Sequence, residues 1–240
     1  MTSNNTPKEI NISKNDSSNT YTLEHLYSLS ISIPQFEFED GRVDAVHVNV
    51  RPTNHVYSRS TTPTDDIQAF QKTGELILKL EHYRDDPQQI KTDGQGKTKT
   101  DSEARIFCPE KYEQSKLLPT FIEELNERPN KISVLPNRGD ARTCLSALIQ
   151  LSPPYAANEY FLVFFTLHKK RAASVNMVIE TAFVVSEPDF RVRLLTESKN
   201  QHQRRPFIVL LKNTLAGRLP FESAPQKARK KKTKRKARNK

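Results

Sequence analysis

Apolar and polar residues alternate along several segments of the first half of the chain. Residues 46–50 place valine at every second position, with His, Asn and Arg nearby, and residues 76–80 do the same with leucine. This alternation is typical of a strand that buries one face. A further short strand is predicted over 105–108. The first half is therefore expected to contribute several half-buried strands.

The second half is richer in apolar runs. The run EYFLVFFTLH at 159–168 is apolar at odd and even positions, which predicts a central strand covered on both faces. The polar stretch 168–174 predicts a hairpin connection to the next run. Gly217 is consistent with either a strand or a short helix closing before it. The predicted strands of this half are 143–151, 159–168, 174–185, 190–196 and 206–212.

One principal helix is predicted over 109–127. Pro109 suits the first turn of a helix, and Glu110 follows it near the positive end of the helix dipole. Pro119 predicts a kink or a division into two short helices, because its ring is incompatible with a helix interior. The apolar stripe of this helix consists of Leu118, Phe121, Ile122 and Leu125.

Polar segments flank and interrupt these elements. Residues 1–20 are rich in Asn, Ser and Thr, and disorder is predicted because little apolar surface offsets the entropy of ordering. Residues 85–103 have no period and predict a long loop or hairpin tip. Residues 21–33 fit a helix or a strand, with Pro34 ending either. We predict one α+β domain over 21–226, mainly an antiparallel sheet with one principal helix.

Charge changes this picture, because the net charge of +10 belongs to one end of the chain. Residues 227–240 contain ten basic residues and no acid, which leaves 28 basic and 28 acidic residues elsewhere. The body is therefore neutral, and the segment 227–240, which we call the basic tail, is predicted to be disordered. Its cations are Lys227, Arg229, Lys230, Lys231, Lys232, Lys234, Arg235, Lys236, Arg238 and Lys240.

Such a tail is suited to bind the phosphate backbone of nucleic acid, because each phosphate that it neutralises releases counterions and so favours binding. Phosphate contacts give affinity and fast association without base-sequence choice. An acidic protein, an anionic membrane surface and a tail without a specific partner are the alternatives. The tail has no aromatic or aliphatic anchor for a membrane, so no membrane partner is expected. In a eukaryote the same segment would resemble a nuclear localisation signal.

One segment of the body has the residue types of an acid–base site. HVNVRPTNHVYSR contains His47, Arg51, His55 and Tyr57 within eleven residues. Metal-independent RNA cleavage uses such groups, two for proton transfer and an arginine for the phosphorane charge. The alternative is that they are outward polar residues of a surface strand. No metal site is predicted, because two histidines without a third ligand do not complete a zinc site.

Two other residues are candidates for a chemical role. Cys108 precedes the predicted helix, where a thiolate is stabilised by the dipole, but a buried structural cysteine is the alternative. Glu180 lies in an apolar strand and needs a partner if it is buried. The two cysteines, Cys108 and Cys144, make no disulfide framework and favour a reducing cytoplasm. No cofactor is expected.

Several segments in order resemble a bacterial family carried on mobile elements and genomes. They are HVNVRPTNHVYSR, RIFCPEKYEQSKLLP, EYFLVFFTLH, VNMVIETAFVV and PFIVLLKNTLAGR, and the resemblance covers about 40–220. Some members of that family are labelled stationary-phase growth adaptation proteins. The resemblance implies no catalytic residues.

A second resemblance concerns VNMVIETAF. It is similar to a late strand in toxin-like ribonucleases of the Barnase, EndoU, colicin and RelE group, which implies a helix packed on an antiparallel sheet. It also implies metal-free RNA cleavage, with Thr181 beside Ala182 and Phe183 at the site. The basic tail and the 85–103 segment depart from that pattern.

Three hypotheses follow. The first is a nucleic-acid-associated accessory protein of a bacterial mobile element or stress response, which binds RNA or DNA through its basic tail in the cytoplasm, or in the nucleus of a eukaryote. The second is a metal-independent ribonuclease with His47, Arg51, His55, Tyr57 and Thr181 at its site. The third is a protein-interaction module whose tail is incidental.

Overall fold

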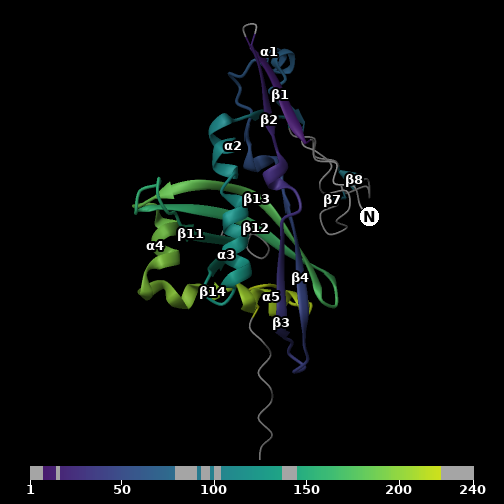
Figure 1. Cartoon of the computed structure of the whole chain (residues 1–240), viewed down its shortest axis with the longest axis vertical. Coiled ribbons are helices and arrows are strands. Elements are labelled where there is room, and N and C mark those ends of the chain that lie inside the picture. Colours follow the sequence, from purple (N-terminus) through teal and green to yellow (C-terminus); the bar gives the residue numbers. More distant parts are fainter. Residues whose placement is uncertain are drawn as a thin grey trace, which may run out of the picture.

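The computed structural model describes residues 8–14, 17–78, 91–92, 98–99, 104–136 and 145–222. Within these ranges the predicted α+β class is confirmed, and the largest element is a seven-stranded, mostly antiparallel sheet (Figure 1). From edge to edge its strands are β14 (Arg205–Pro206), β10 (Ser133–Pro136), β11 (Leu145–Gln150), β12 (Glu159–Arg171), β13 (Ser174–Ser186), β4 (Val43–Pro52) and β3 (Ser30–Glu37).

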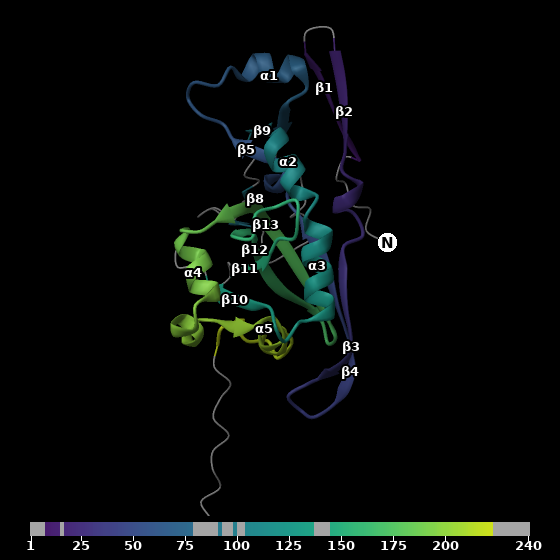
Figure 2. The ribbon, with the colours of Figure 1, turned by 60° about the vertical axis from the view of Figure 1, so that its left-hand side comes forward.

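The apolar run predicted to be a central strand is β12, the middle strand of this sheet. One face of β12 points Phe161 and Phe165 into the main core, and the other points Leu162 and Phe164 into a second cluster. Figure 2 shows why both faces are apolar: the sheet lies between α3 (Leu118–Glu127) on one side and α4 (Phe190–Thr196) on the other. The prediction of a strand covered on both faces is therefore confirmed.

The predicted helix over 109–127 is divided. The helix α2 runs over Pro109–Ser115 and α3 begins at Leu118, with Pro119 in its first turn. Because a proline is tolerated in the first turn and not in a helix interior, Pro119 starts a new helix instead of kinking one. The expected apolar stripe is buried on α3, and Phe121 meets Phe161 of β12 with ring centroids 6.5 Å apart.

Two predicted strands are helices. Residues 190–196 form α4, where the Asp189 carboxylate accepts a hydrogen bond from the Arg191 backbone N–H. Val192 and Leu195, one helical turn apart, are its buried residues. Residues 207–215 form α5 (Phe207–Leu215), so the helix alternative is correct for this segment and the strand alternative is wrong. The positions 207, 210, 211, 214 and 215 are buried, which is helical spacing.

The N-terminal prediction of disorder over 1–20 is wrong for the residues that the structure describes. The strands β1 (Glu9–Lys14) and β2 (Ser17–Thr22) pair as an antiparallel hairpin. Ile10 and Ile12 alternate with polar residues on β1 and are buried in the core. These two side chains supply the apolar surface that the composition of the segment had obscured.

The strand β3 continues through Pro34, which was expected to end it. β3 is an edge strand, where proline is tolerated because one side of the strand needs no ladder hydrogen bond. The pairing register with β4 shifts between Ile33 and Phe36, so the proline lies in an irregular stretch. A 3₁₀ turn, η1 (Glu24–Leu26), precedes β3 within the segment whose pattern was ambiguous.

A second, smaller sheet lies beyond the end of β4. It consists of β5 (Ser58–Ser60), β9 (Ala104–Phe107) and β6 (Leu76–Leu78), with α1 (Ile67–Thr73) before β6. Within the segment predicted as a long loop or a hairpin tip at 85–103, β7 (Lys91–Thr92) and β8 (Thr98–Lys99) pair antiparallel, in agreement with the hairpin alternative. The rest of that loop and the basic tail lie outside the described residues.

Candidate functional site

The candidate site lies where the end of β4 meets an irregularity in β13. After β4 the chain forms the 3₁₀ turn η2 (Asn54–Val56). The Thr53 backbone N–H donates to the Ile179 carbonyl at 2.9 Å, and the Thr53 hydroxyl donates to the Glu180 carbonyl at 2.9 Å. Opposite β12 the register skips Glu180, which is the extra residue of a β-bulge. Bulges bend a strand and redirect its side chains, so Thr181 follows a local bend.

Lys111 of α2 links these segments. Its ammonium donates to the carbonyl oxygens of His55 (2.9 Å) and Ser58 (3.2 Å) and to the Thr181 hydroxyl oxygen (3.3 Å). An ammonium group has three protons, so all three are used in holding α2, η2 and β13 together. The pKa of Lys111 is lowered, first by burial and then by the positive charge of Arg105. The nearby Cys108 acts in the opposite direction and offsets only part of this lowering.

Arg105 of β9 reinforces the same corner from inside. Its side chain is 4 % exposed, and Nε donates to Ser58 Oγ at 2.8 Å while Nη2 donates to the Ser58 carbonyl at 3.1 Å. Ser58 Oγ in turn donates to the Asn54 carbonyl at 2.5 Å. The corner is therefore a connected network of hydrogen bonds. Neither Lys111 nor Arg105 is predicted from the sequence as a site residue.

The structure brings two of the five proposed catalytic residues together. His55 and Thr181 are both half-buried and meet at the Lys111 ammonium, His55 through its backbone carbonyl. Tyr57 follows η2 and is 1 % exposed. Burial, followed by the nearby Tyr27, raises the pKa of the Tyr57 phenol. Tyr57 is therefore a buried, protonated core residue at neutral pH.

His47 and Arg51 lie on β4, and they are separated along it. Arg51 is half-buried and faces Val178 of β13, whereas His47 is exposed and faces Ser174 at the start of β13. They are four positions apart along the strand, about 13 Å at the usual rise per residue. An acid–base pair must reach one phosphate within hydrogen-bonding distance. The structure does not place His47 beside His55, so these two histidines do not form such a pair.

The other two candidate residues border this corner. Cys108 is a half-buried free thiol, and its backbone N–H donates to the Tyr57 carbonyl at 3.0 Å. Glu180 is half-buried at the bulge. Among the described residues no group of three or more His, Cys, Asp or Glu side chains is placed to hold a metal ion. No helix within the described ranges combines the length and the apolar character needed to cross a membrane.

By its fold this is an α+β protein built on a seven-stranded, mostly antiparallel sheet, and its described residues hold no group of side chains placed to bind a metal ion. Residues 12–215 match the model of the YjaZ family, so the chain belongs to that family. Comparisons with curated proteins and with solved structures find no match. The basic tail lies beyond the matched residues, and the family's description states no activity.

Proposed function

We propose that this protein binds nucleic acid through its basic tail, without preference for base sequence. The resemblance to a bacterial family carried on mobile elements suggests the setting, an accessory role in a bacterial mobile element or stress response in the cytoplasm. One observation carries the proposal: residues 227–240 hold ten cations and no acid, while the rest of the chain balances 28 basic against 28 acidic residues. The excess charge is thus concentrated on fourteen consecutive residues.

Concentrated charge of this kind has a measurable consequence. Each phosphate that a cation neutralises on duplex DNA contributes about −0.9 to the slope of log K against log salt concentration, and about −0.7 on a single strand. Engagement of even half of the ten cations would therefore give a slope of about −4. Contacts to phosphate carry no base information, so affinity should depend on salt far more than on sequence.

The test compares three proteins: the full chain, the chain with the ten tail cations changed to glutamine, and a 1–226 truncation. Binding to RNA and to duplex DNA is measured over a salt series. The full chain is expected to bind with a steep salt slope that both altered proteins lose. Equal affinity of all three at low salt would contradict the proposal.

The same samples, run on denaturing gels, test the ribonuclease hypothesis. Metal-independent cleavage by the tail-neutralised chain would make the body an enzyme and reduce the tail to an arm that recruits substrate. In that event, His55→Ala is expected to abolish cleavage and His47→Ala is not, because His47 lies in the middle of β4 beside the start of β13, away from the corner. Absence of both binding and cleavage would favour the protein-interaction hypothesis.

A further inference from the structure

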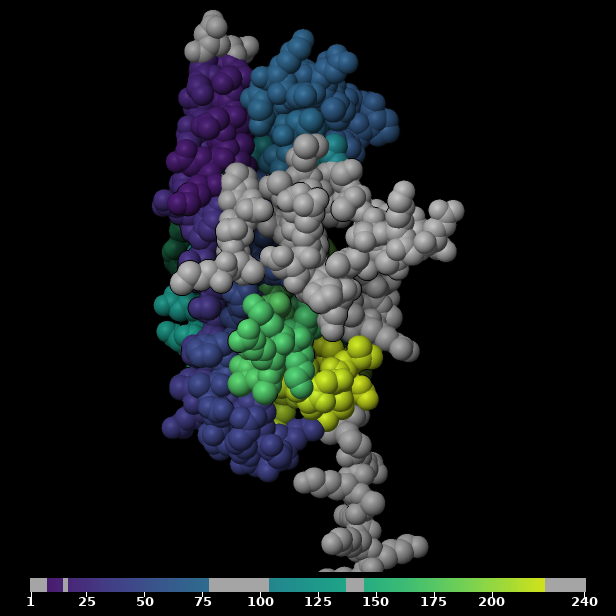
Figure 3. Space-filling view, turned by 90° about the vertical axis from the view of Figure 1, so that its right-hand side faces the viewer, coloured from purple at the N-terminus to yellow at the C-terminus, as the bar shows by residue number. Residues whose placement is uncertain are grey.

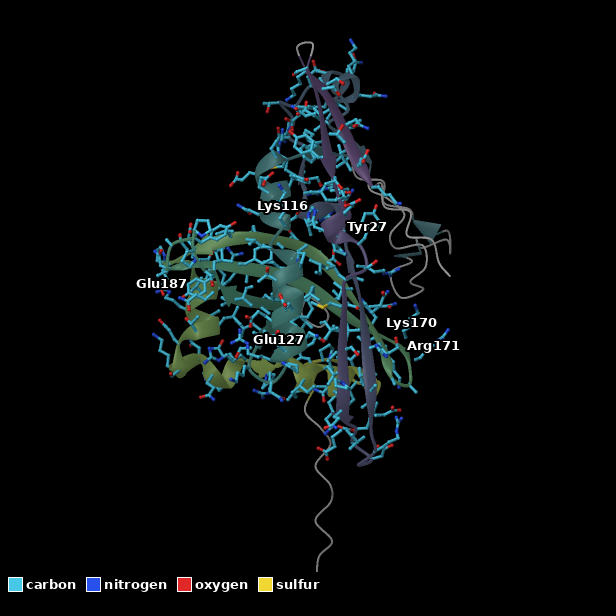
Figure 4. The ribbon with its side chains drawn as sticks, viewed as in Figure 1. Tyr27, Lys116, Glu127, Lys170, Arg171 and Glu187 are labelled. Carbon is cyan, nitrogen blue, oxygen red and sulfur yellow. The ribbon has the colours of Figure 1, made fainter. Side chains whose placement is uncertain are left out.

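A second group of cations lies on the folded body, at the tip of the β12–β13 hairpin. Lys169, Lys170 and Arg171 are consecutive and exposed, and none of them forms an ion pair with a described residue. Figure 4 shows Lys170 and Arg171 pointing outward from the end of the hairpin, and Figure 3 shows this end at the surface. We call these three residues the hairpin cations.

Parallel pairing places β4 beside this tip. The His47 backbone N–H donates to the Ala173 carbonyl at 3.1 Å, and His47 faces Ser174. One row further, Asn49 faces Asn176, with Asn49 Nδ2 at 3.5 Å from Asn176 Oδ1. His47 is therefore not part of the predicted acid–base site. It belongs to a polar surface formed by β4 and β13.

The charged residues of this surface are all basic. Residues 168–176 of the hairpin and 47–51 of β4 contain lysine, arginine, histidine and asparagine but no acid. The nearest carboxylate along β4 is Asp44, which is paired with Arg42 at 2.9 Å. Unneutralised cations among amide and imidazole hydrogen-bond donors are the groups that contact phosphate and sugar in nucleic-acid complexes.

The surface also lacks the large aromatic side chains on which the bases of single strands stack. Proteins that hold single-stranded nucleic acid stack its bases on aromatic side chains, and neither 168–176 nor 47–51 contains Phe, Tyr or Trp. A projecting hairpin that carries cations suits the outside of a duplex, whose bases are already stacked. We infer that the hairpin cations, with His47 beside them, form a second contact for the phosphate backbone of duplex DNA.

This inference takes its partner from the proposed function but rests on different residues, so the two are tested apart. The hairpin variant of the full chain is K169Q/K170Q/R171Q. A matched control, K8Q/K72Q/K131Q, removes the same charge from three exposed lysines elsewhere. Both variants are also made in the full chain whose tail cations are glutamine. Binding to a 20-base-pair duplex and to single-stranded RNA is measured over a salt series, and circular dichroism verifies folding.

The hairpin variant is expected to bind the duplex on the order of tenfold more weakly than the matched control at moderate salt, with a slope shallower by up to about 2.7. Its binding to single-stranded RNA should match that of the control. Equal duplex binding by the hairpin variant and the control would overturn the inference and leave the tail proposal intact. An equal loss for single-stranded RNA would overturn the assignment to duplex. A hairpin effect without any tail effect would reject the tail proposal alone.

Discussion

At the scale of single residues, the candidate site is organised by the Lys111 ammonium, which links three segments of the chain. Lys111 reaches three oxygen acceptors on three separate segments, and its ammonium has no fourth proton to offer a substrate. Arg105 makes three more hydrogen bonds to Ser58 and Ser60 from a buried position. We therefore expect the main role of these two cations to be the stability of the fold.

Replacing Lys111 with methionine tests this expectation. The substitution keeps the apolar stem and removes the ammonium, so the His55 carbonyl and the Thr181 hydroxyl each lose this donor, while the Ser58 carbonyl keeps its hydrogen bond from Arg105. Losing hydrogen bonds from a partly buried charged group typically costs about 1–3 kcal/mol, and the free energy of unfolding in urea should fall by that amount. Lys72→Met, at an exposed position on α1, is the control and should change stability by less than about 0.5 kcal/mol. Equal effects would show that the Lys111 contacts contribute nothing.

The residues of this corner were only partly predictable from the sequence. His55 and Thr181 were selected by their chemical types, and Lys111 does join them. Lys111 and Arg105 were missed because their partners are mostly backbone carbonyls and serines, which have no sequence pattern. The bulge at Glu180 brings Thr181 to the corner, and a bulge of one residue leaves no trace in the alternation of β13.

At the scale of elements, strands with strong periodicity were predicted well and short helices were not. The central strand β12 is marked by apolar residues on both faces, because both faces are covered. In contrast, RVRLL in α4 satisfies both alternation and helical spacing, and the predicted strand is wrong. The Asp189 cap at its start was the available helix signal. The β1–β2 hairpin was missed because two isoleucines are few among polar residues.

Gly74 offers a test of the packing of that hairpin. It ends α1 with a φ of +78°, and a Cβ added there would lie 2.4 Å from the Asn11 carbonyl oxygen of β1. Gly74→Ala should therefore destabilise the protein by the left-handed strain of about 1–2 kcal/mol and by a further cost for displacing β1. Hydrogen exchange of the β1 amides should also accelerate.

Gly41→Ala is the matched control, because Gly41 has a φ of +86° and no atom within 4 Å of an added Cβ. It should show the backbone strain alone, without faster exchange in β1. Equal losses of stability in the two variants would mean that β1 does not pack against Gly74. The comparison thus separates conformational strain from a steric contact between two elements far apart in sequence.

At the scale of the whole molecule, a neutral body carries two separate groups of cations. The described chain ends at Glu222, and the buried Asn213 of α5 fastens this end by donating to the carbonyls of Pro220 (2.7 Å) and Glu222 (2.9 Å). Arg218 pairs with Glu39 near the β3–β4 turn. The basic tail therefore starts from a fixed point on the body, after a connection of four residues. The sequence revealed the charge of the tail but not this attachment.

A fixed attachment matters if the tail and the hairpin cations bind one duplex, because the first contact then raises the effective concentration of the second. Inserting twenty Gly/Ser residues after Glu222 lengthens a connection of four residues to 24, with a root-mean-square span of about 27 Å. Effective concentration falls roughly as the −3/2 power of linker length, so duplex affinity of the full chain should fall on the order of tenfold.

The matched control is the same insertion in the chain that carries K169Q/K170Q/R171Q. There the tail binds alone, so linker length should leave duplex affinity unchanged. An insertion that weakens both proteins equally would point to a change in the tail itself. An insertion that changes the duplex affinity of neither protein would mean that the tail and the hairpin cations bind different nucleic-acid molecules. The protein would then bridge two duplexes instead of binding one duplex at two places.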